Sequence, residues 1–370
     1  MKISCAKEIK KHEYRVGLTP ENAKEYVNYG HAVYIETGAG LGSGFADEEY
    51  KKMGAQILGS AKEVWAIADM MVKVKEPLPE EYAYFKEGLI LYTYLHLAAD
   101  RPLTDALLKS KVCAVAYETI RDKTGALPLL RPMSEVAGRL SIQAGAKCLE
   151  KPAGGMGLLL GGIPGVKKAH VMILGAGVVG MSALKMALGL GARVSIFDNN
   201  IARLAYLDDL FGQQIQTVFS TDTAIEQAIV GADLVIGGVL IPGAAAPKLI
   251  KRAYLKTMKK GSVIVDVAVD QGGCCETTKA TYHDNPTFVI DDVVHYCVAN
   301  MPGAVSRTST LGLTNATLPY GLQIANKGME AVAQADAGFC LGINCYRSAI
   351  TCKEVAEGFG LPHVALKTLF

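Results

Sequence analysis

Two stretches decide the fold of this chain: residues 170–180, HVMILGAGVVG, and residues 193–198, RVSIFD. The first reads as a buried strand, a glycine turn and the start of a helix, and the second as another strand that ends in a carboxylate. This order of elements is typical of an α/β domain whose parallel sheet is covered by helices on both faces. We therefore expect a doubly wound, Rossmann-like domain around these residues.

Each glycine of the turn suits the binding of a dinucleotide. Gly175 permits a tight turn, Gly177 lets the backbone approach a pyrophosphate, and Gly180 lets the helix lie close to the strand. The amide-rich N-terminus of the helix would face the phosphates. Asp198 is placed to accept hydrogen bonds from the adenosine ribose and to repel a 2′-phosphate. The pattern thus predicts NAD, rather than NADP, as the cofactor.

The strand and helix pattern divides the chain into three parts. Residues 129–305 alternate strand and helix and form the predicted NAD-binding domain. Residues 1–128 read as a second Rossmann-like α/β domain, which would hold the substrate. Residues 306–370 are too few for a domain of their own, so we expect them to pack back on the first part.

The expected elements follow from apolar runs and capping residues. Thr19 and Pro20 open a first helix, and long helices are expected around 134–150 and 315–336, as crossings between the domains, with short helices after them. Other helices should begin near Val178, Ile201, Thr221 and Pro247. Strands are expected at 32–36, 70–75, 89–94 and 112–116 in the first domain, and at 171–174, 194–197, 234–236, 262–265 and 288–290 in the second.

The composition points to a soluble enzyme that acts on small molecules. The 370 residues are 50% hydrophobic and 20% charged, with a formal net charge of +2, which gives no reason to expect nucleic acid or a membrane surface as partner. The charged N-terminus shows no secretory signal, so a cytoplasmic location is expected. The nine cysteines form no C-x-x-C pair and the histidines have no ligand spacing with them, so we expect reduced thiols and no metal site.

Charged groups and one histidine follow the predicted strands of the first domain. Arginine grips a carboxylate with two parallel hydrogen bonds and lysine adds a point charge, so Arg15 and Lys75 are candidates for holding a carboxylate substrate. His96 is a candidate proton carrier. By position alone, Arg15 and Lys75 are more typical of solvated surface charges than of ligands, and His96 suits a structural histidine as well as a catalytic one. In the second domain Asp270 falls at the carboxyl end of a buried strand, whereas Asp266 is expected to make a structural hydrogen bond.

These residues together resemble the alanine dehydrogenase family, which also includes the NAD(H)-binding domain of proton-translocating transhydrogenase. The resemblance covers essentially the whole chain, and its motifs are collinear. They are RVGLTP at 15–20, VKVKEP at 72–77, YLH at 94–96, PMSEVAG at 132–138, GGIPG at 161–165, DQGG at 270–273 and HYCVANMPG at 295–303.

The resemblance implies a reversible, NAD-dependent conversion of L-alanine to pyruvate and ammonia. It implies that Arg15 and Lys75 hold the substrate carboxylate, that His96 is the acid/base, and that Asp270 lies near the reacting centre and the nicotinamide ribose. It further implies a discontinuous substrate domain and a homo-hexamer. The residues that it implies for the NAD site, besides the three glycines and Asp270, are Ser134, Asp198, Arg203, Ser220, Leu240, Val267, Asn300 and Met301.

Three positions depart from the family pattern. Cys148 and Met156 stand where polar or basic residues are common, and Ser306 stands where proline is expected.

Two other functions stay open. One alternative is a hydride-relay module that passes hydride to a partner subunit. The other is a dehydrogenase for a larger amino acid, of the lysine or saccharopine type.

Overall fold

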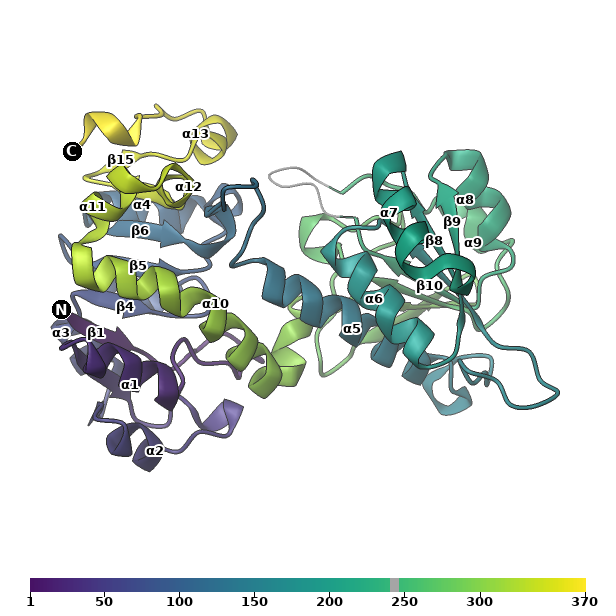
Figure 1. Cartoon of the computed structure of the whole chain (residues 1–370), viewed down its shortest axis with the longest axis horizontal. Helices are drawn as coiled ribbons and strands as arrows, with labels where there is room; N and C mark the ends of the chain where they lie inside the picture. Colours follow the sequence, from purple (N-terminus) through teal and green to yellow (C-terminus); the bar gives the residue numbers. More distant parts are fainter. Residues whose placement is uncertain (240–245) are drawn as a thin grey trace. The chain divides into compact units, whose positions relative to one another are not determined.

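The computed structural model describes residues 1–239 and 246–370. The chain forms two compact units, and each is described here by itself (Figure 1). Unit 1 comprises Met1–Met133 together with Val305–Phe370, and unit 2 is the inserted stretch Ser134–Ala304. The long helix α5 (Arg131–Cys148) carries the chain from the first part of unit 1 into unit 2.

Unit 1 is built on a mixed sheet of eight strands, counted over the described residues, in the order β15-β14-β6-β5-β4-β1-β2-β3. The pairs from β6 to β3 are parallel, whereas β14 runs antiparallel to β6 and β15 antiparallel to β14. The short helices expected after the last long helix are present, but the C-terminal tail also adds two strands that were not predicted. The strands are β1 (Lys2–Cys5), β2 (Ala32–Glu36), β3 (Gln56–Leu58), β4 (Met70–Val72), β5 (Ile90–Thr93), β6 (Cys113–Ala116), β14 (Ile343–Tyr346) and β15 (Ala349–Ile350).

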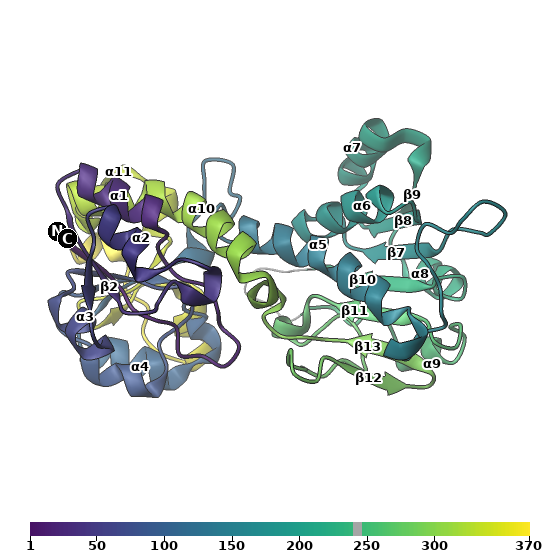
Figure 2. The same ribbon diagram turned by 90° about the horizontal axis from the view of Figure 1, so that it is seen from below.

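Helices cover both faces of this sheet (Figure 2). Successive side chains of β5 show it: Leu91 packs in an apolar core with residues of α3, α4 and α13, and the hydroxyl of Tyr92 donates to Thr317 O in α10 on the opposite face. As expected, Thr19 caps α1 by accepting from Asn22 N. The helices of unit 1 are α1 (Pro20–Asn28), α2 (Asp47–Lys52), α3 (Ala61–Ile67), α4 (Arg101–Lys109), α10 (Ser306–Lys327), α11 (Met329–Ala335), α12 (Ala337–Cys340) and α13 (Lys353–Phe359).

The long helix expected at 315–336 is instead two helices, α10 and α11. They meet at Gly328, whose φ of +81° breaks the helix. Helix α10 also begins earlier than expected. Its first turns were not predicted because their buried face carries hydroxyls rather than apolar groups. The Thr310 hydroxyl, for example, lies 2.8 Å from Ser43 Oγ and accepts from Val16 N. Hydrophobic periodicity does not detect such a face.

Unit 2 is a second doubly wound sheet, with seven strands over the described residues in the order β12-β13-β11-β10-β7-β8-β9. All pairs are parallel except the antiparallel edge pair β12–β13. The predicted α/β class with two Rossmann-like units is therefore confirmed. The strands are β7 (His170–Leu174), β8 (Arg193–Asp198), β9 (Ile215–Phe219), β10 (Leu234–Gly237), β11 (Val263–Asp266), β12 (Thr287–Ile290) and β13 (Val293–Tyr296), and the helices besides α5 are α6 (Val178–Gly189), α7 (Ile201–Phe211), α8 (Asp222–Ile229) and α9 (Arg252–Leu255).

Two strands and one helix of unit 2 differ from the expectation. Strand β9 was missed because it is a half-exposed edge strand, and β13 because it contains a buried histidine, His295. The helix expected near Pro247 was wrong. The chain there is irregular: Leu249 N and Ile250 N donate to Cys274 O, Ile250 forms an isolated β-bridge with Cys275, and α9 starts only at Arg252.

Candidate active site

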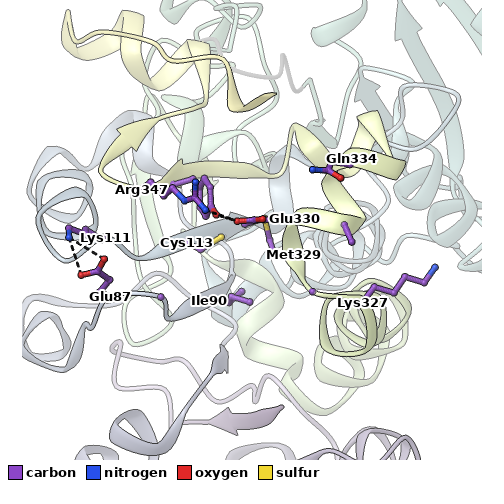
Figure 3. Close-up of a pocket in the computed structure, with 13 residues that line it drawn as sticks. Glu87, Ile90, Lys111, Cys113, Lys327, Met329, Glu330, Gln334 and Arg347 are labelled. Carbon is purple, nitrogen blue, oxygen red and sulfur yellow. Dashed lines mark hydrogen bonds and ion pairs between the residues drawn. The ribbon is translucent and has the colours of Figure 1, made fainter. Parts of the chain in front are cut away.

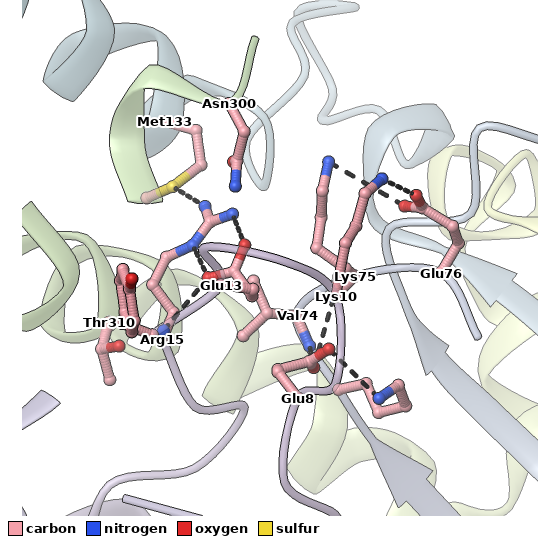
Figure 4. Close-up of polar contacts among 12 residues, drawn as sticks. Glu8, Lys10, Glu13, Arg15, Val74, Lys75, Glu76, Met133, Asn300 and Thr310 are labelled. Carbon is pink, nitrogen blue, oxygen red and sulfur yellow. Dashed lines mark hydrogen bonds and ion pairs between the residues drawn. The ribbon is translucent and has the colours of Figure 1, made fainter. Parts of the chain in front are cut away.

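Three candidate residues of unit 1 lie at the carboxyl edge of its sheet, and two of them, Arg15 and Lys75, are labelled in Figure 4. Arg15 follows β1, Lys75 follows β4 and His96 follows β5, and β1, β4 and β5 are neighbours in the sheet. Loops that follow adjacent parallel strands meet at one edge, which is where open α/β sheets bind ligands. The topology therefore brings together three groups that lie far apart in the sequence.

Arg15 is a buried cation, only 3% exposed, so the alternative of a solvated surface charge is wrong for it. Its guanidinium donates from Nε to Glu13 Oε1 at 2.7 Å and from Nη2 to Glu13 Oε2 at 2.5 Å, and its Nη1 lies 3.0 Å from Met133 Sδ. Burial opposes the charge, but the paired Glu13 carboxylate raises the pKa of Arg15. The guanidinium is thus held rigid and charged, with one edge against a thioether, which is a weak acceptor.

Lys75 and His96 share one carboxylate. Lys75 Nζ lies 3.9 Å and His96 Nδ1 3.5 Å from Glu76 Oε2, and Lys10 forms an ion pair with the other oxygen, Oε1. Burial alone would raise the pKa of Glu76, but His96, Lys75 and Lys10 together hold it well below its usual value. The carboxylate therefore stays ionised at neutral pH and orients both candidates.

A buried ion network supports the loop that carries Lys75. Lys73 is fully buried, and its Nζ lies 3.1 Å from Glu8 Oε2 and 3.0 Å from Glu81 Oε1. Glu8 Oε1 in turn accepts from Val74 N at 2.7 Å and from Lys75 N at 3.3 Å. Beyond the end of β4 at Val72, Lys73 N still donates to Tyr92 O in β5, and the Glu8 carboxylate satisfies the amides of Val74 and Lys75.

The glycine turn of unit 2 has the geometry that a dinucleotide needs. Gly175 has a φ of +95°, and a Cβ added at Gly180 would lie 1.8 Å from Gly175 O, so only glycine permits this approach of helix and strand. At Gly177, by contrast, a Cβ would meet no described atom within 4 Å. The turn thus leaves open space beside the N-terminus of α6, where a pyrophosphate would lie. The residues present fit NAD.

Asp198 ends β8 beside this turn, as predicted. Its Oδ2 accepts from Ala176 N and its Oδ1 from Asn200 N, at 2.7 and 2.8 Å. Arg203 lies at the same place, since its Nε donates to Ala176 O at 2.7 Å. A carboxylate oxygen can accept more than one hydrogen bond, so Asp198 keeps the capacity to accept from the ribose hydroxyls.

The other predicted cofactor residues lie at several places in unit 2. Ser220 N donates to Asp198 O, and Val267 N donates to Gly237 O, so these two lie at the carboxyl edge of the sheet. Asp270 is exposed in the turn after β11, and Ser134 lies on α5. Asn300, with a φ of +62°, precedes the buried Met301. Leu240 lies outside the described residues.

Asp266 and the cysteines are structural. As expected, Asp266 is fully buried and accepts from Ala268 N, Cys275 N and the Thr278 hydroxyl. The nine cysteines are unpaired thiols, and burial raises the pKa of Cys274 and Cys275, which disfavours reactive thiolates. Among residues 1–239 and 246–370, no group of three or more His, Cys, Asp and Glu side chains is placed to hold a metal ion.

A cavity of about 880 Å³ opens at the opposite edge of the sheet of unit 1 (Figure 3). Ile90 and Cys113, the first residues of β5 and β6, line it, so it lies away from Lys75 and His96. Four of the charged groups that line it form two ion pairs, Lys111 with Glu87 and Arg347 with Glu330. We assign this cavity no part in the site.

Family models match nearly the whole chain. "Alanine dehydrogenase/PNT, N-terminal domain" matches residues 4–137, and "Alanine dehydrogenase/PNT, C-terminal domain" matches residues 141–353. The chain belongs to the alanine dehydrogenase/PNT family. The resemblance inferred from the sequence motifs is thereby confirmed, and with it the membership of an NAD-dependent family of oxidoreductases.

Named relatives agree with this family. The chain is 53% identical over 369 residues to an alanine dehydrogenase of Halomonas elongata, covering 100% of both chains. It is 55% identical to an alanine dehydrogenase of Staphylococcus haemolyticus, covering 99% of this chain and 98% of that one. A solved L-alanine dehydrogenase has a TM-score of 0.94 at 51% identity, over 97% of this chain and 99% of that one.

A transhydrogenase of Sinorhizobium meliloti is also similar in structure. Its TM-score is 0.83 at 25% identity, and the match covers 95% of this chain and 99% of that one. The fold of this oxidoreductase family is thus shared with a transhydrogenase. Among the described residues, the structure has no helix that is both long and apolar enough to span a membrane.

The charged residues that hold the candidates in place were not predicted from the sequence. Glu13 had a signal, since it lies two residues before Arg15. Lys73 also had one, since a lysine between two valines at the end of a strand is expected to be buried. Glu8 and Glu118 had no such signal, because their partners are distant in the sequence and are brought near only by the sheet.

Proposed function

We propose that this protein is an NAD-dependent L-alanine dehydrogenase, which interconverts L-alanine with pyruvate and ammonia. The observation that carries the proposal is the convergence of Lys75 and His96 on one partly buried carboxylate, that of Glu76, beside the buried cation of Arg15. Two cations and a proton carrier suit a small carboxylate substrate whose reacting carbon lies next to the carboxylate.

Arg15 and Lys75 hold the substrate carboxylate in this proposal. The Nη1 of Arg15 lies against the sulfur of Met133, a weak acceptor, and a substrate carboxylate is a much stronger acceptor for the guanidinium. Lys75 adds a second positive charge at the same edge. Because both cations are anchored by Glu13 and Glu76, they orient the substrate Cα rather than merely attract it.

His96 moves the proton. In the oxidative direction, loss of hydride from Cα leaves an iminium, which water attacks to form a C–O bond while His96 takes the proton of that water. The carbinolamine then loses ammonia by C–N cleavage and becomes pyruvate. Glu76 faces Nδ1 and favours the tautomer that carries its proton there, so Nε2 is the acceptor.

NAD, when bound, supplies the acceptor for the hydride. The glycine turn and Asp198 of unit 2 would hold its pyrophosphate and adenosine ribose, with Ser134, Arg203, Ser220, Val267, Asn300 and Met301 as further contacts.

We also propose that Asp270 stabilises the positive charge of the amine or iminium, that the protein assembles as a homo-hexamer, and that it is cytoplasmic. Sedimentation of the purified protein tests the assembly.

The test of the activity is the consumption of NADH with pyruvate and ammonium supplied together, compared with either omitted and with NADPH. Turnover that needs both substrates and prefers NADH is the expected result. Turnover with pyruvate alone would make the protein a hydroxy-acid dehydrogenase, and activity only on long amino acids would place it with the lysine-type enzymes.

A hydride-relay module is the second candidate, supported by the structural likeness to a transhydrogenase. Such a module binds NADH but reduces no oxo acid by itself. Tight binding of NADH with no turnover on pyruvate, glyoxylate or 2-oxobutyrate would therefore favour it over the dehydrogenase.

A further inference from the structure

His96 has an uncommon backbone conformation. Its φ of 51° and ψ of 35° lie in the left-handed helical region, which few residues other than glycine adopt. A residue stays in this region only when its surroundings hold it there. The conformation also fixes the direction of the Cα–Cβ bond, and hence the volume that the imidazole can reach.

The carboxylate of Glu118 holds this backbone. Its Oε1 accepts from His96 N at 2.6 Å and from Leu95 N at 3.1 Å, and its Oε2 lies 3.3 Å from Leu95 N. Glu118 lies in the 3₁₀ turn directly after β6, the strand next to β5 in the sheet. The loop that carries His96 is thereby tied to the neighbouring strand.

We propose that Glu118 is a positioning residue that fixes His96 in its left-handed conformation for proton transfer. The proposal rests on the proposed role of His96. Hydrogen bonds from amides to an ionised carboxylate are about twice as strong as neutral ones, so one carboxylate on two successive amides is an effective clamp. Without it, the backbone at His96 relaxes to a more common conformation, and the imidazole moves away from Glu76.

Hydrogen–deuterium exchange tests the clamp without any assay of activity. In Glu118→Ala the amides of Leu95 and His96 lose their acceptor, so we expect the peptide that contains them to exchange at least about tenfold faster, with β8 unchanged. Glu118→Gln keeps a carbonyl oxygen as acceptor and should restore most of the protection. Unchanged exchange of this peptide in Glu118→Ala would overturn the clamp.

A double-mutant cycle tests whether the clamp acts through His96. Glu118→Ala should lower kcat by about 10²-fold, since small misplacements of a catalytic group have effects of this size, and Glu118→Gln should recover most of it. In a His96→Ala background, measured at high enzyme concentration, the same change should alter kcat by no more than about twofold. An equal loss in both backgrounds would mean general structural damage and would overturn the proposal.

Glu49→Ala is the matched control. Like Glu118→Ala, it removes a carboxylate of unit 1 that accepts a hydrogen bond from a backbone amide, here Ala46 N at 2.7 Å at the start of α2. This change should leave kcat unchanged. If His96→Ala itself keeps a normal kcat, the proposed role of His96 fails, while the exchange experiment still decides whether Glu118 clamps the loop.

Discussion

The two units use the same edge of the same kind of sheet in different ways. In unit 1 the carboxyl edge is built from side-chain charges that are buried and paired, as in Glu13 with Arg15 and in Lys73 with Glu8. In unit 2 it is built largely from backbone, with the tight turn at Gly175, open space at Gly177 and close helix–strand packing at Gly180. In the proposed function, a small carboxylate would therefore meet fixed charges, and a large dinucleotide would meet a turn with few side chains.

This difference predicts where each unit is vulnerable. Removing one charge from unit 1 leaves its partner buried and unpaired, which is expensive. Adding one methyl group to the turn of unit 2 forces the helix and strand apart at Gly180, or fills the open space at Gly177.

The largest effect is expected for His96→Ala. Positioned proton transfer contributes about 10²–10⁴-fold to the rate, so kcat should fall by that factor in both directions of the reaction. NADH binding, followed by fluorescence, should be unchanged because the glycine turn lies in unit 2. A near-normal kcat across the pH range would disprove the assignment of the proton carrier.

Glu13→Ala should destabilise the protein by about 3–5 kcal/mol, since it leaves the Arg15 guanidinium buried without its carboxylate. Urea unfolding followed by the fluorescence of Trp65, the single tryptophan, reports on unit 1. Glu48→Ala is the control, because its pair with Lys51 is exposed and should contribute less than about 1 kcal/mol. Equal effects of the two changes would contradict the view that buried pairs build this edge.

Gly180→Ala should lower the stability of unit 2 by about 1–3 kcal/mol and weaken NADH binding, because the new Cβ would collide with Gly175 O. Gly189→Ala in the same helix is the matched control. A Cβ there meets no described atom within 4 Å, so this change should be neutral or slightly stabilising. Calorimetry and NADH titration of both variants decide, and normal NADH affinity in Gly180→Ala would refute the assignment of the turn.

The smallest effect is a difference in acid stability. Burial lowers the pKa of His170 and His295 in unit 2, so the unfolded chain takes up protons first as the pH falls below 6.5, the ordinary histidine value, and unit 2 loses stability there. In unit 1 the lowered pKa of Glu76 contributes stability that is lost only below about 4.5, and the raised pKa of Glu8 acts in the opposite direction.

Unit 2 should therefore begin to unfold at a higher pH than unit 1. Trp65 fluorescence reports on unit 1, and loss of NADH binding reports on unit 2. Each tenfold difference in proton affinity between the folded and unfolded states corresponds to about 1.4 kcal/mol, so the separation should be modest. His170→Gln should reduce it, and simultaneous loss of both signals would count against the assignment.

The sequence sufficed for features that depend on neighbours along the chain. The glycine turn, Asp198 and the Thr19 cap were predicted because each motif lies within one turn or one strand–helix–strand unit. Strand β13 and the hydroxyl-lined face of α10 were not, because buried polar groups that bond one another hide the apolar pattern. Long-range charge pairs such as Lys73 with Glu8 need the strand order before they can be inferred.

The antiparallel strand β14 has a consequence for synthesis of the chain on the ribosome. Strand β6 is complete before residue 120, yet its sheet neighbour β14 is translated only after the whole of unit 2. The nascent chain thus carries an open strand edge throughout the synthesis of the inserted unit, and such edges invite pairing with other chains. Unit 2 is continuous in sequence and can close first, whereas unit 1 is completed only when β14 emerges, so truncations that remove β14 should aggregate rather than merely shorten the protein.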